Sequence, residues 1–248
     1  MIAISIAGFD PSGGAGILSD LKTFSALGVY GTGVITALTA QNVQRVSSIS
    51  PIGSDFIEEQ IDLILEDLPV IYGKTGMLYS KEIIKSVSKK ISEYEMEIVV
   101  DPVMVAGSGG SLSQEGMAGA MKKYLLKEAL IVTPNVFEAE LLSGMNIETQ
   151  EDAIEAAHKI GELCDVVITG GHLDGDNILY NGQISIIGGE LMESNNTHGS
   201  GCSFSAAIAA YMSKGIEMET AIKKADIFVK ESIKYGHWGT LNQFWKSE

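Results

Sequence analysis

The segment 196–210, with the sequence NTHGSGCSFSAAIAA, carries the strongest local signal in this chain. Two glycines bracket Ser200, and a run of small residues typical of a buried helix follows them. The first amides of a helix have no partner inside the helix, and the helix dipole adds positive potential at that end. Glycines also let a ligand approach the backbone closely. The segment therefore predicts a cradle for a phosphoryl group, with the thiol of Cys202 inside it.

Composition limits the classes of protein to which the chain can belong. Its 248 residues have a formal net charge of -15 and are 45% hydrophobic, which fits one α/β domain with a large core. Arg45 is the only arginine, so the sequence offers no basic stripe for nucleic acid or for an anionic membrane surface. The two cysteines, Cys164 and Cys202, are far apart and favour a reducing, cytoplasmic setting. The apolar start, residues 1–7, lacks a basic leader and is expected to be a strand.

Short β-branched runs alternate with helical patterns along the chain. This alternation predicts a doubly wound, mainly parallel sheet in a three-layer α/β/α domain that spans residues 1–248. Glycine turns near the end of the pattern predict a small antiparallel β-meander, through which we expect a homodimer to pair. The predicted strands are 2–7, 34–38, 70–72, 97–100, 130–132, 166–169, 177–180, 183–187 and 190–193, and the predicted helices are 15–27, 54–68, 80–92, 113–126, 136–142, 149–163, 201–213 and 217–235.

Glycine and polar residues follow the first strands. The loop 8–16, GFDPSGGAG, opens like a P-loop but lacks its lysine, so it is either a plain turn or a loop that admits a ligand close to the backbone. Asp20, one turn into the next helix, faces either a ligand or solvent. The amide of Gln41 suits the edge of a heterocycle or an ordinary turn. Met77 suits a ring face or the core.

Oxygen-bearing side chains follow two further strands. Asp101 ends one strand, and Thr133 and Asn135 follow the next. Glu138 shares a helix face with Asn135. Such oxygen atoms at the carboxyl ends of strands suit a water-rich Mg²⁺ site. The alternative is a capping box formed by Asn135 and Glu138, and the pattern leaves both interpretations open.

In combination and in this order, the motifs resemble those of hydroxymethylpyrimidine and phosphomethylpyrimidine kinases, thiamine-biosynthesis members of the ribokinase-like superfamily. The resemblance covers residues 4–235. It implies a ribokinase-like fold and ATP- and Mg²⁺-dependent phosphorylation of 4-amino-5-hydroxymethyl-2-methylpyrimidine, then of its monophosphate. The motifs are AGFDPSGGAGILSDLKTFSALG, TALTAQN, GMLYS, VVDPVMVAGSG, TPNVFEAELLSG, ITGGH and NTHGSGCSFSAAIAA.

The resemblance also implies roles for individual residues. Gly199, Ser200 and Gly201 would form an anion hole beside Cys202, which would act as a base or orient the hydroxyl. We expect the helix N-terminus to lower the pKa of this thiol. Asn135 and Glu138 would organise Mg²⁺. The pyrimidine would contact Gly8, Asp20, Gln41, Met77, Val103 and Val105, and the nucleotide would contact Asp101, Thr133, Thr169, Gly171 and Thr197.

Departures from the family pattern remove positive charge. Phe9 replaces a small polar residue, and Gly107 and Thr169 stand where lysine is frequent, which leaves the phosphate contacts open. The alternative functions are a pyridoxal kinase, a ribokinase-type sugar kinase, and a non-catalytic pyrimidine or nucleotide sensor. Cys202 in place of an acidic base disfavours the sugar kinase. The retained Asn135 and Glu138 argue against the sensor.

Overall fold

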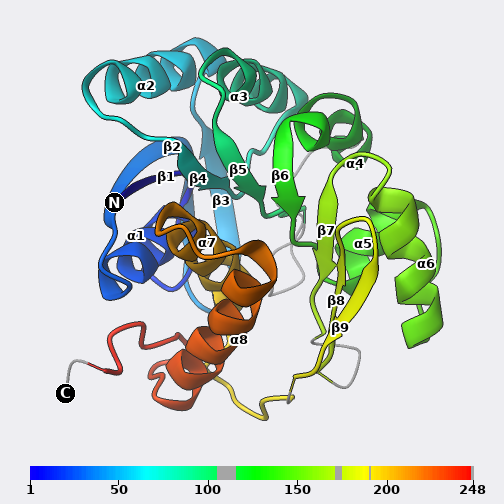
Figure 1. Cartoon of the computed structure of the whole chain (residues 1–248). Coiled ribbons are helices and arrows are strands. Elements are labelled where there is room, and N and C mark those ends of the chain that lie inside the picture. The colour runs from blue at the N-terminus through cyan, green and yellow to red at the C-terminus, as the bar shows by residue number, and fades with distance from the viewer. Residues whose placement is uncertain (105–115, 171–174, 190, 247–248) are drawn as a thin grey trace.

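A mixed β-sheet forms the middle layer of the molecule (Figure 1). The computed structural model describes residues 1–104, 116–170, 175–189 and 191–246. In spatial order, the strands of the sheet are β3 (Val46–Pro51), β2 (Tyr30–Gln41), β1 (Ile2–Phe9), β4 (Tyr72–Thr75), β5 (Glu97–Val100), β6 (Ala129–Val132), β7 (Asp165–Ile168), β8 (Asn177–Tyr180) and β9 (Ile184–Ile187).

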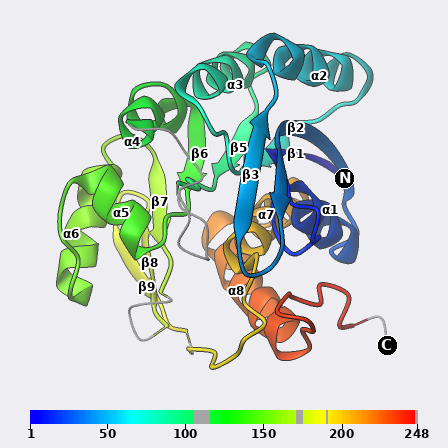
Figure 2. The ribbon, with the colours of Figure 1, turned by 180° about the vertical axis from the view of Figure 1, so that it is seen from behind.

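The centre of the sheet is parallel and its two edges are antiparallel. Strands β2, β1, β4, β5, β6 and β7 pair in parallel, which brings their carboxyl ends to one rim. At one edge β3 pairs antiparallel with β2, and at the other the β8–β9 hairpin joins β7 (Figure 2). The mainly parallel sheet predicted from the alternating pattern is confirmed.

Helices cover both faces of the sheet (Figure 1). One core packs α2 to α6 against the sheet, and the other packs α1, α7 and α8 against its opposite face. The three predicted layers are therefore confirmed. The helices are α1 (Gly16–Ala26), α2 (Ser54–Asp67), α3 (Lys81–Glu93), α4 (Met117–Ala120), α5 (Val136–Ser143), α6 (Gln150–Ile160), α7 (Ser200–Ser213) and α8 (Met218–Lys234), with a π-helical turn η1 (Met121–Leu125) and a 3₁₀ turn η2 (Leu126–Glu128) after α4.

One strand was not predicted and one predicted strand is wrong, for different physical reasons. Strand β3 is missing from the prediction because its sequence, VSSISP, is polar, and it gains its order only by pairing with the end of β2. The predicted strand 190–193 is wrong over its described part, residues 191–193. Leu191 lines a pocket and Met192 packs against the core of α7 and α8, so these side chains leave the sheet.

The helix predicted over 113–126 is helical from Met117 onward but changes pitch twice, and residues 113–115 lie outside the described part. Among the described residues, no helix is long and apolar enough to cross a membrane.

Candidate active site

The start of α7 lies at the rim formed by the carboxyl ends of the parallel strands. Gly199 adopts a left-handed conformation with φ of 88°, and a Cβ there would lie 1.9 Å from the carbonyl oxygen of Gly14. Only glycine fits this close approach of the two loops. Gly201 differs, because no described atom lies within 4 Å of the place where its Cβ would be. Its glycine leaves space for a ligand at the first amides of the helix.

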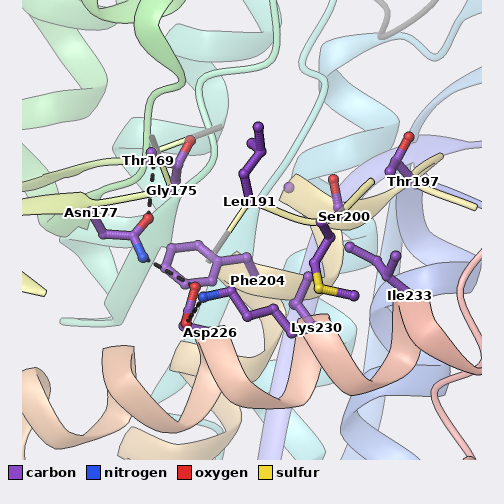
Figure 3. A pocket seen from close by; sticks show the side chains of 14 residues that line it. Thr169, Gly175, Asn177, Leu191, Thr197, Ser200, Phe204, Asp226, Lys230 and Ile233 are labelled. Carbon is purple, nitrogen blue, oxygen red and sulfur yellow. Dashed lines mark hydrogen bonds and ion pairs between the residues drawn. The ribbon is translucent and has the colours of Figure 1, made fainter. Parts of the chain in front are cut away.

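A cavity of about 380 Å³ lies at this rim. Figure 3 shows Thr169, Thr197 and Ser200 around it, with Phe204 at its floor. The predicted nucleotide contacts Thr169 and Thr197 are thus brought together with the predicted anion hole. Two others, Asp101 and Thr133, do not line it, and Gly171 lies outside the described residues. The lining residues are Thr169, Gly170, Gly175, Asn177, Leu191, Met192, Thr197, Ser200, Gly201, Phe204, Asp226, Val229, Lys230 and Ile233.

One end of this cavity is polar. Asn177 accepts a hydrogen bond from the amide of Gly170 at 3.0 Å and donates one to Asp226 at 3.1 Å (Figure 3). Lys230 lies 2.6 Å from the other oxygen of Asp226. These residues escaped the sequence analysis, because α8 reads as an ordinary amphipathic helix. The i, i+4 spacing of Asp226 and Lys230 was the available signal.

A second, smaller pocket of about 50 Å³ lies on the other side of the helix start. It brings together the predicted pyrimidine contacts Gly8, Gln41, Met77 and Val103, and it includes Cys202. A Cβ on Gly8 would lie 2.5 Å from Cε of Met77, so the glycine makes room for the thioether. Val105 lies outside the described residues. The full lining is Gly8, Phe9, Asp10, Gly16, Thr39, Gln41, Met77, Val103 and Cys202.

Asp20 does not line this pocket, which corrects its predicted place. It is fully buried, accepts a 2.6 Å hydrogen bond from Ser5 and lies 3.3 Å from Nζ of Lys74. Burial raises the pKa of Asp20 to about 6, and the charge of Lys74 opposes that rise. Lys74 escaped the sequence analysis, although a lysine inside a short buried strand is itself a signal.

The thiol of Cys202 does not have the lowered pKa expected from its helix position. Dense packing around the sulfur raises the pKa of Cys202 to about 12, although the residue as a whole is only half-buried. Lys74 lowers this pKa, while Asp101 and Asp20 raise it further. Loss of solvation thus outweighs the helix dipole, and the resting protein holds a neutral thiol.

Asp10 is a further site residue that the sequence did not single out. Its carboxylate accepts hydrogen bonds from the amides of Ser12 and Ala15 at 2.8 Å and 2.9 Å, and it contacts Nε2 of His198 at 2.8 Å. Although burial opposes ionisation, the bonds from His198, Ser12 and Gln41 hold the pKa of Asp10 at about 2. The spacing of Asp10 and Ser12, typical of a loop that hydrogen-bonds its own backbone, was the available signal.

The Asn135–Glu138 pair forms the capping box that the pattern allowed. Asn135 accepts from the amide of Glu138, and Glu138 accepts from the amide of Asn135, each at 3.0 Å. Burial, with Asp101 nearby, raises the pKa of Glu138 to about 8. No cluster of three or more His, Cys, Asp or Glu residues suited to a metal exists in the described ranges. Two buried carboxylates that repel each other are nevertheless a donor set that a divalent cation would relieve.

The chain is similar to known proteins over nearly its whole length. The family model described as phosphomethylpyrimidine kinase matches residues 10–243. The hydroxymethylpyrimidine/phosphomethylpyrimidine kinase of Bacillus subtilis is 39% identical over 240 residues, which cover 94% of this chain and 89% of that protein. The thiamine biosynthesis bifunctional protein ThiED of Geobacter sulfurreducens is 42% identical over 239 residues. That match covers 93% of this chain, and the chain spans 49% of the bifunctional protein.

Solved structures share both the fold and the sequence. The pyridoxal kinase of Bacillus subtilis in an ADP complex has a TM-score of 0.87 and 39% identity, and covers 98% of this chain and 94% of that one. The phosphomethylpyrimidine kinase of Clostridium difficile has a TM-score of 0.83 and 37% identity, over 94% of this chain and 99% of that one. The pyridoxal kinase of Staphylococcus aureus with ADP has a TM-score of 0.90 and 34% identity, and the match covers 100% of this chain and 94% of that one. With its pockets, its glycine cradle and these matches, the chain belongs to the phosphomethylpyrimidine kinase family.

Proposed function

We propose that this kinase transfers the γ-phosphoryl group of ATP to the hydroxyl of 4-amino-5-hydroxymethyl-2-methylpyrimidine, and then phosphorylates the monophosphate, in thiamine biosynthesis. One observation carries the proposal. Cys202 lines the small pocket, while Ser200 and Gly201, two residues and one residue before it, line the large one. A pyrimidine in the first pocket and a triphosphate in the second would meet at the start of α7.

The geometry suits in-line transfer through a loose transition state, in which positioning and charge stabilisation dominate. The amides at the start of α7 bind the transferred phosphoryl group, and the bare Cα of Gly201 lets it approach. Gln41 orients the pyrimidine edge. Cys202 orients the substrate hydroxyl and, after its own ionisation to the thiolate, accepts the hydroxyl proton late in the transfer. With one arginine in the chain, backbone amides carry much of the phosphate charge.

Mg²⁺ is part of this proposal. When bound, it supplies positive charge that offsets the phosphate oxygens. Glu138 would hold it with Asn135, partly through water, and Asp101 adds negative potential beside them. The raised pKa of Glu138 supports this assignment, because a cation beside the buried carboxyl would favour its ionised form.

Phosphorylation of pyridoxal is the second candidate function. The ADP-bound pyridoxal kinases of Bacillus subtilis and Staphylococcus aureus cover 98% and 100% of this chain, with TM-scores of 0.87 and 0.90. Gln41 favours the first candidate, because its amide can pair with an aminopyrimidine edge. Pyridoxal would present a hydroxyl and an aldehyde to this pocket in place of the aminopyrimidine edge.

Release of ADP, measured side by side with the hydroxymethyl pyrimidine, its monophosphate, pyridoxal and ribose, tests the proposal. We expect turnover with the first two substrates, and a variant Cys202→Ala serves as the control for contaminating kinases. Turnover with pyridoxal alone would replace the proposed substrate. Absence of turnover with every acceptor would remove the kinase function proposed for this site.

We also propose a homodimer in the cytoplasm. Strand β9 is an edge of the sheet, and Ile186 on it is 49% exposed, so a second copy can cover this hairpin. Sedimentation at micromolar concentration should give the mass of a dimer, and the variant Ile186→Lys should sediment as a monomer. A wild-type monomer would contradict this arrangement.

A further inference from the structure

Lys74 is a buried cation that the mechanism above does not use. It lies on β4 with no exposed surface, between Asp20 at 3.3 Å and Asp101 at 3.5 Å. Ser5 on β1 donates a 2.6 Å hydrogen bond to Oδ2 of Asp20, the same oxygen that lies nearest to Lys74. The three charged side chains, Lys74, Asp20 and Asp101, are called the Lys74 cluster below. They join α1, β4 and the end of β5 beneath the rim where the two pockets meet.

The Lys74 cluster is connected to the first turn of α7. Oγ of Ser205 donates to Oδ2 of Asp101 at 3.3 Å, and the same hydroxyl lies 3.1 Å and 3.0 Å from the carbonyl oxygens of Gly201 and Cys202. Ser205 follows Cys202 by almost one helical turn. Lys74, through Asp101 and Ser205, is therefore linked to the segment that carries the anion hole and the thiol.

A purely structural role does not explain this cluster well. Burying one ammonium and two carboxylates carries a large desolvation cost, and apolar side chains of similar volume often serve a core equally well or better. The cluster also holds two acids for one base, so it is not neutral. The remaining negative charge and the ammonium both lie within electrostatic reach of Cys202, whose pKa Asp101 and Asp20 raise and Lys74 lowers.

We propose that Lys74 is a positioning residue for phosphoryl transfer, which holds Asp101 and the first turn of α7 in place and makes the Cys202 thiolate accessible at the moment of proton transfer. This inference rests on the proposed function. In the transfer, the Cys202 thiol, neutral at rest, first loses its proton to solvent, and the substrate O–H bond then breaks as an S–H bond forms again on the Cys202 thiolate. The oxygen electron pair forms the bond to the γ-phosphorus, and the bond from that phosphorus to the β–γ bridging oxygen breaks to release ADP.

Two readouts test this role in the full chain. The first is kcat and KM for ATP with the hydroxymethyl pyrimidine. The second is the rate of alkylation of Cys202 by iodoacetamide without ligand, followed by mass spectrometry of its peptide. The second readout needs no substrate. If the wild-type protein phosphorylates none of the acceptors, the proposed function fails. The alkylation rates of the wild type and the variants still test whether Lys74 affects the Cys202 thiol.

The variant Lys74→Met removes the ammonium. We expect alkylation to slow by about tenfold for each unit by which the pKa of the thiol rises. We expect kcat to fall by about 10²-fold, within the range of a lost proton acceptor, with KM for ATP little changed. Lys90→Met is the matched control, because Lys90 is also buried and ion-paired, to Asp62 at 2.7 Å, but lies on α3. This control should lose stability without slowing alkylation or kcat.

Two further variants keep the test decisive if Lys74→Met folds poorly. The double variant Lys74→Met/Asp20→Asn removes one positive and one negative charge, so the net charge of the cluster is unchanged. It should regain stability but not the alkylation rate or kcat. Asp20→Asn alone removes a negative charge that raises the pKa of Cys202 and keeps the ammonium of Lys74, which lowers it. Alkylation should therefore be faster than in the wild type. Full recovery in the double variant, equal losses in Lys90→Met, or no acceleration in Asp20→Asn would each overturn the proposal.

Discussion

Nε2 of His198 lies 2.8 Å from Oδ2 of Asp10, although 188 residues separate the two in the sequence. This contact joins the glycine loop after β1 to the loop that begins α7. The two loops are so close that a Cβ on Gly14 would lie 2.4 Å from the ring of His198. One wall of the small pocket and the anion hole are thus held by the same carboxylate.

Replacing Asp10 by asparagine should destabilise the protein. Asp10→Asn loses the charge in its bonds to His198, Ser12 and Ala15, and we expect unfolding free energy to fall by about 1.5–3 kcal/mol at pH 7. Because the folded pKa of about 2 lies below the ordinary 3.8, the ionic contribution is complete above pH 3.8 and is lost as pH falls through 2. Urea unfolding at pH 7 and pH 2 measures both effects.

The exposed cap Asp152 gives the control for this prediction. It closes the capping box of α6. Asp152→Asn should cost less than Asp10→Asn, since its bonds are exposed to water. An equal fall in unfolding free energy in the two variants would show that Asp10 stabilises the protein no more than an ordinary helix cap does.

The two glycines of the anion hole should respond in opposite ways to substitution. Gly201→Val places a side chain where no described atom lies within 4 Å, so the fold should persist while phosphoryl transfer falls by about 10²–10³-fold. Gly199→Ala forces a Cβ to 1.9 Å from Gly14 at a φ of 88°, so this variant should lose stability. Thermal unfolding and calorimetric titration with the pyrimidine separate the two losses. Normal turnover in Gly201→Val would contradict the anion hole.

The thiol of Cys202 should affect turnover more than binding. Cys202→Ala removes the group that accepts the hydroxyl proton, and we expect kcat to fall by about 10²–10⁴-fold with KM for ATP nearly unchanged. Cys164→Ala is the control, since Cys164 packs against the core on the far side of the sheet from α7. A Cys202→Ala enzyme with near-normal kcat would leave the thiol without a role in transfer.

Glu138 should couple stability to pH and activity to Mg²⁺. Since its folded pKa of about 8 lies above the ordinary 4.5, its proton stabilises the folded state below pH 4.5, and this contribution is lost as pH rises through 8. Glu138→Gln keeps an acceptor for the capping box but carries no charge. The melting temperature without metal should therefore fall less between pH 5 and 8 in this variant than in the wild type.

The same variant should need about tenfold more Mg²⁺ for half-maximal turnover, at the lower end of the effect of losing a ligand-shell carboxylate. Glu140→Gln, on the same helix, is the control for both measurements. An unchanged Mg²⁺ requirement in Glu138→Gln would remove this residue from the proposed metal site.

The order of elements could be predicted because the signals are local. Apolar periodicity, β-branched runs and glycine turns each act within a few residues. Polar strand β3 and the segment after β9 could not be predicted, because their order depends on what they pack against. Residues 46–51 form a strand because they pair with β2. Leu191 lines the pocket over α7 instead of extending the sheet.

The sequence by itself determined the α/β architecture and the loops that carry the site, since strands that alternate with helices bring glycines such as Gly8 and Gly199 to one rim. Only the tertiary structure decided how the charges meet there. Asp20 is buried beside Lys74 instead of lining the pocket. Loss of solvation keeps the Cys202 thiol neutral, although the charge of Lys74 opposes this effect. Solvation and Coulomb energies depend on distances between residues far apart in the chain, and no local pattern encodes them.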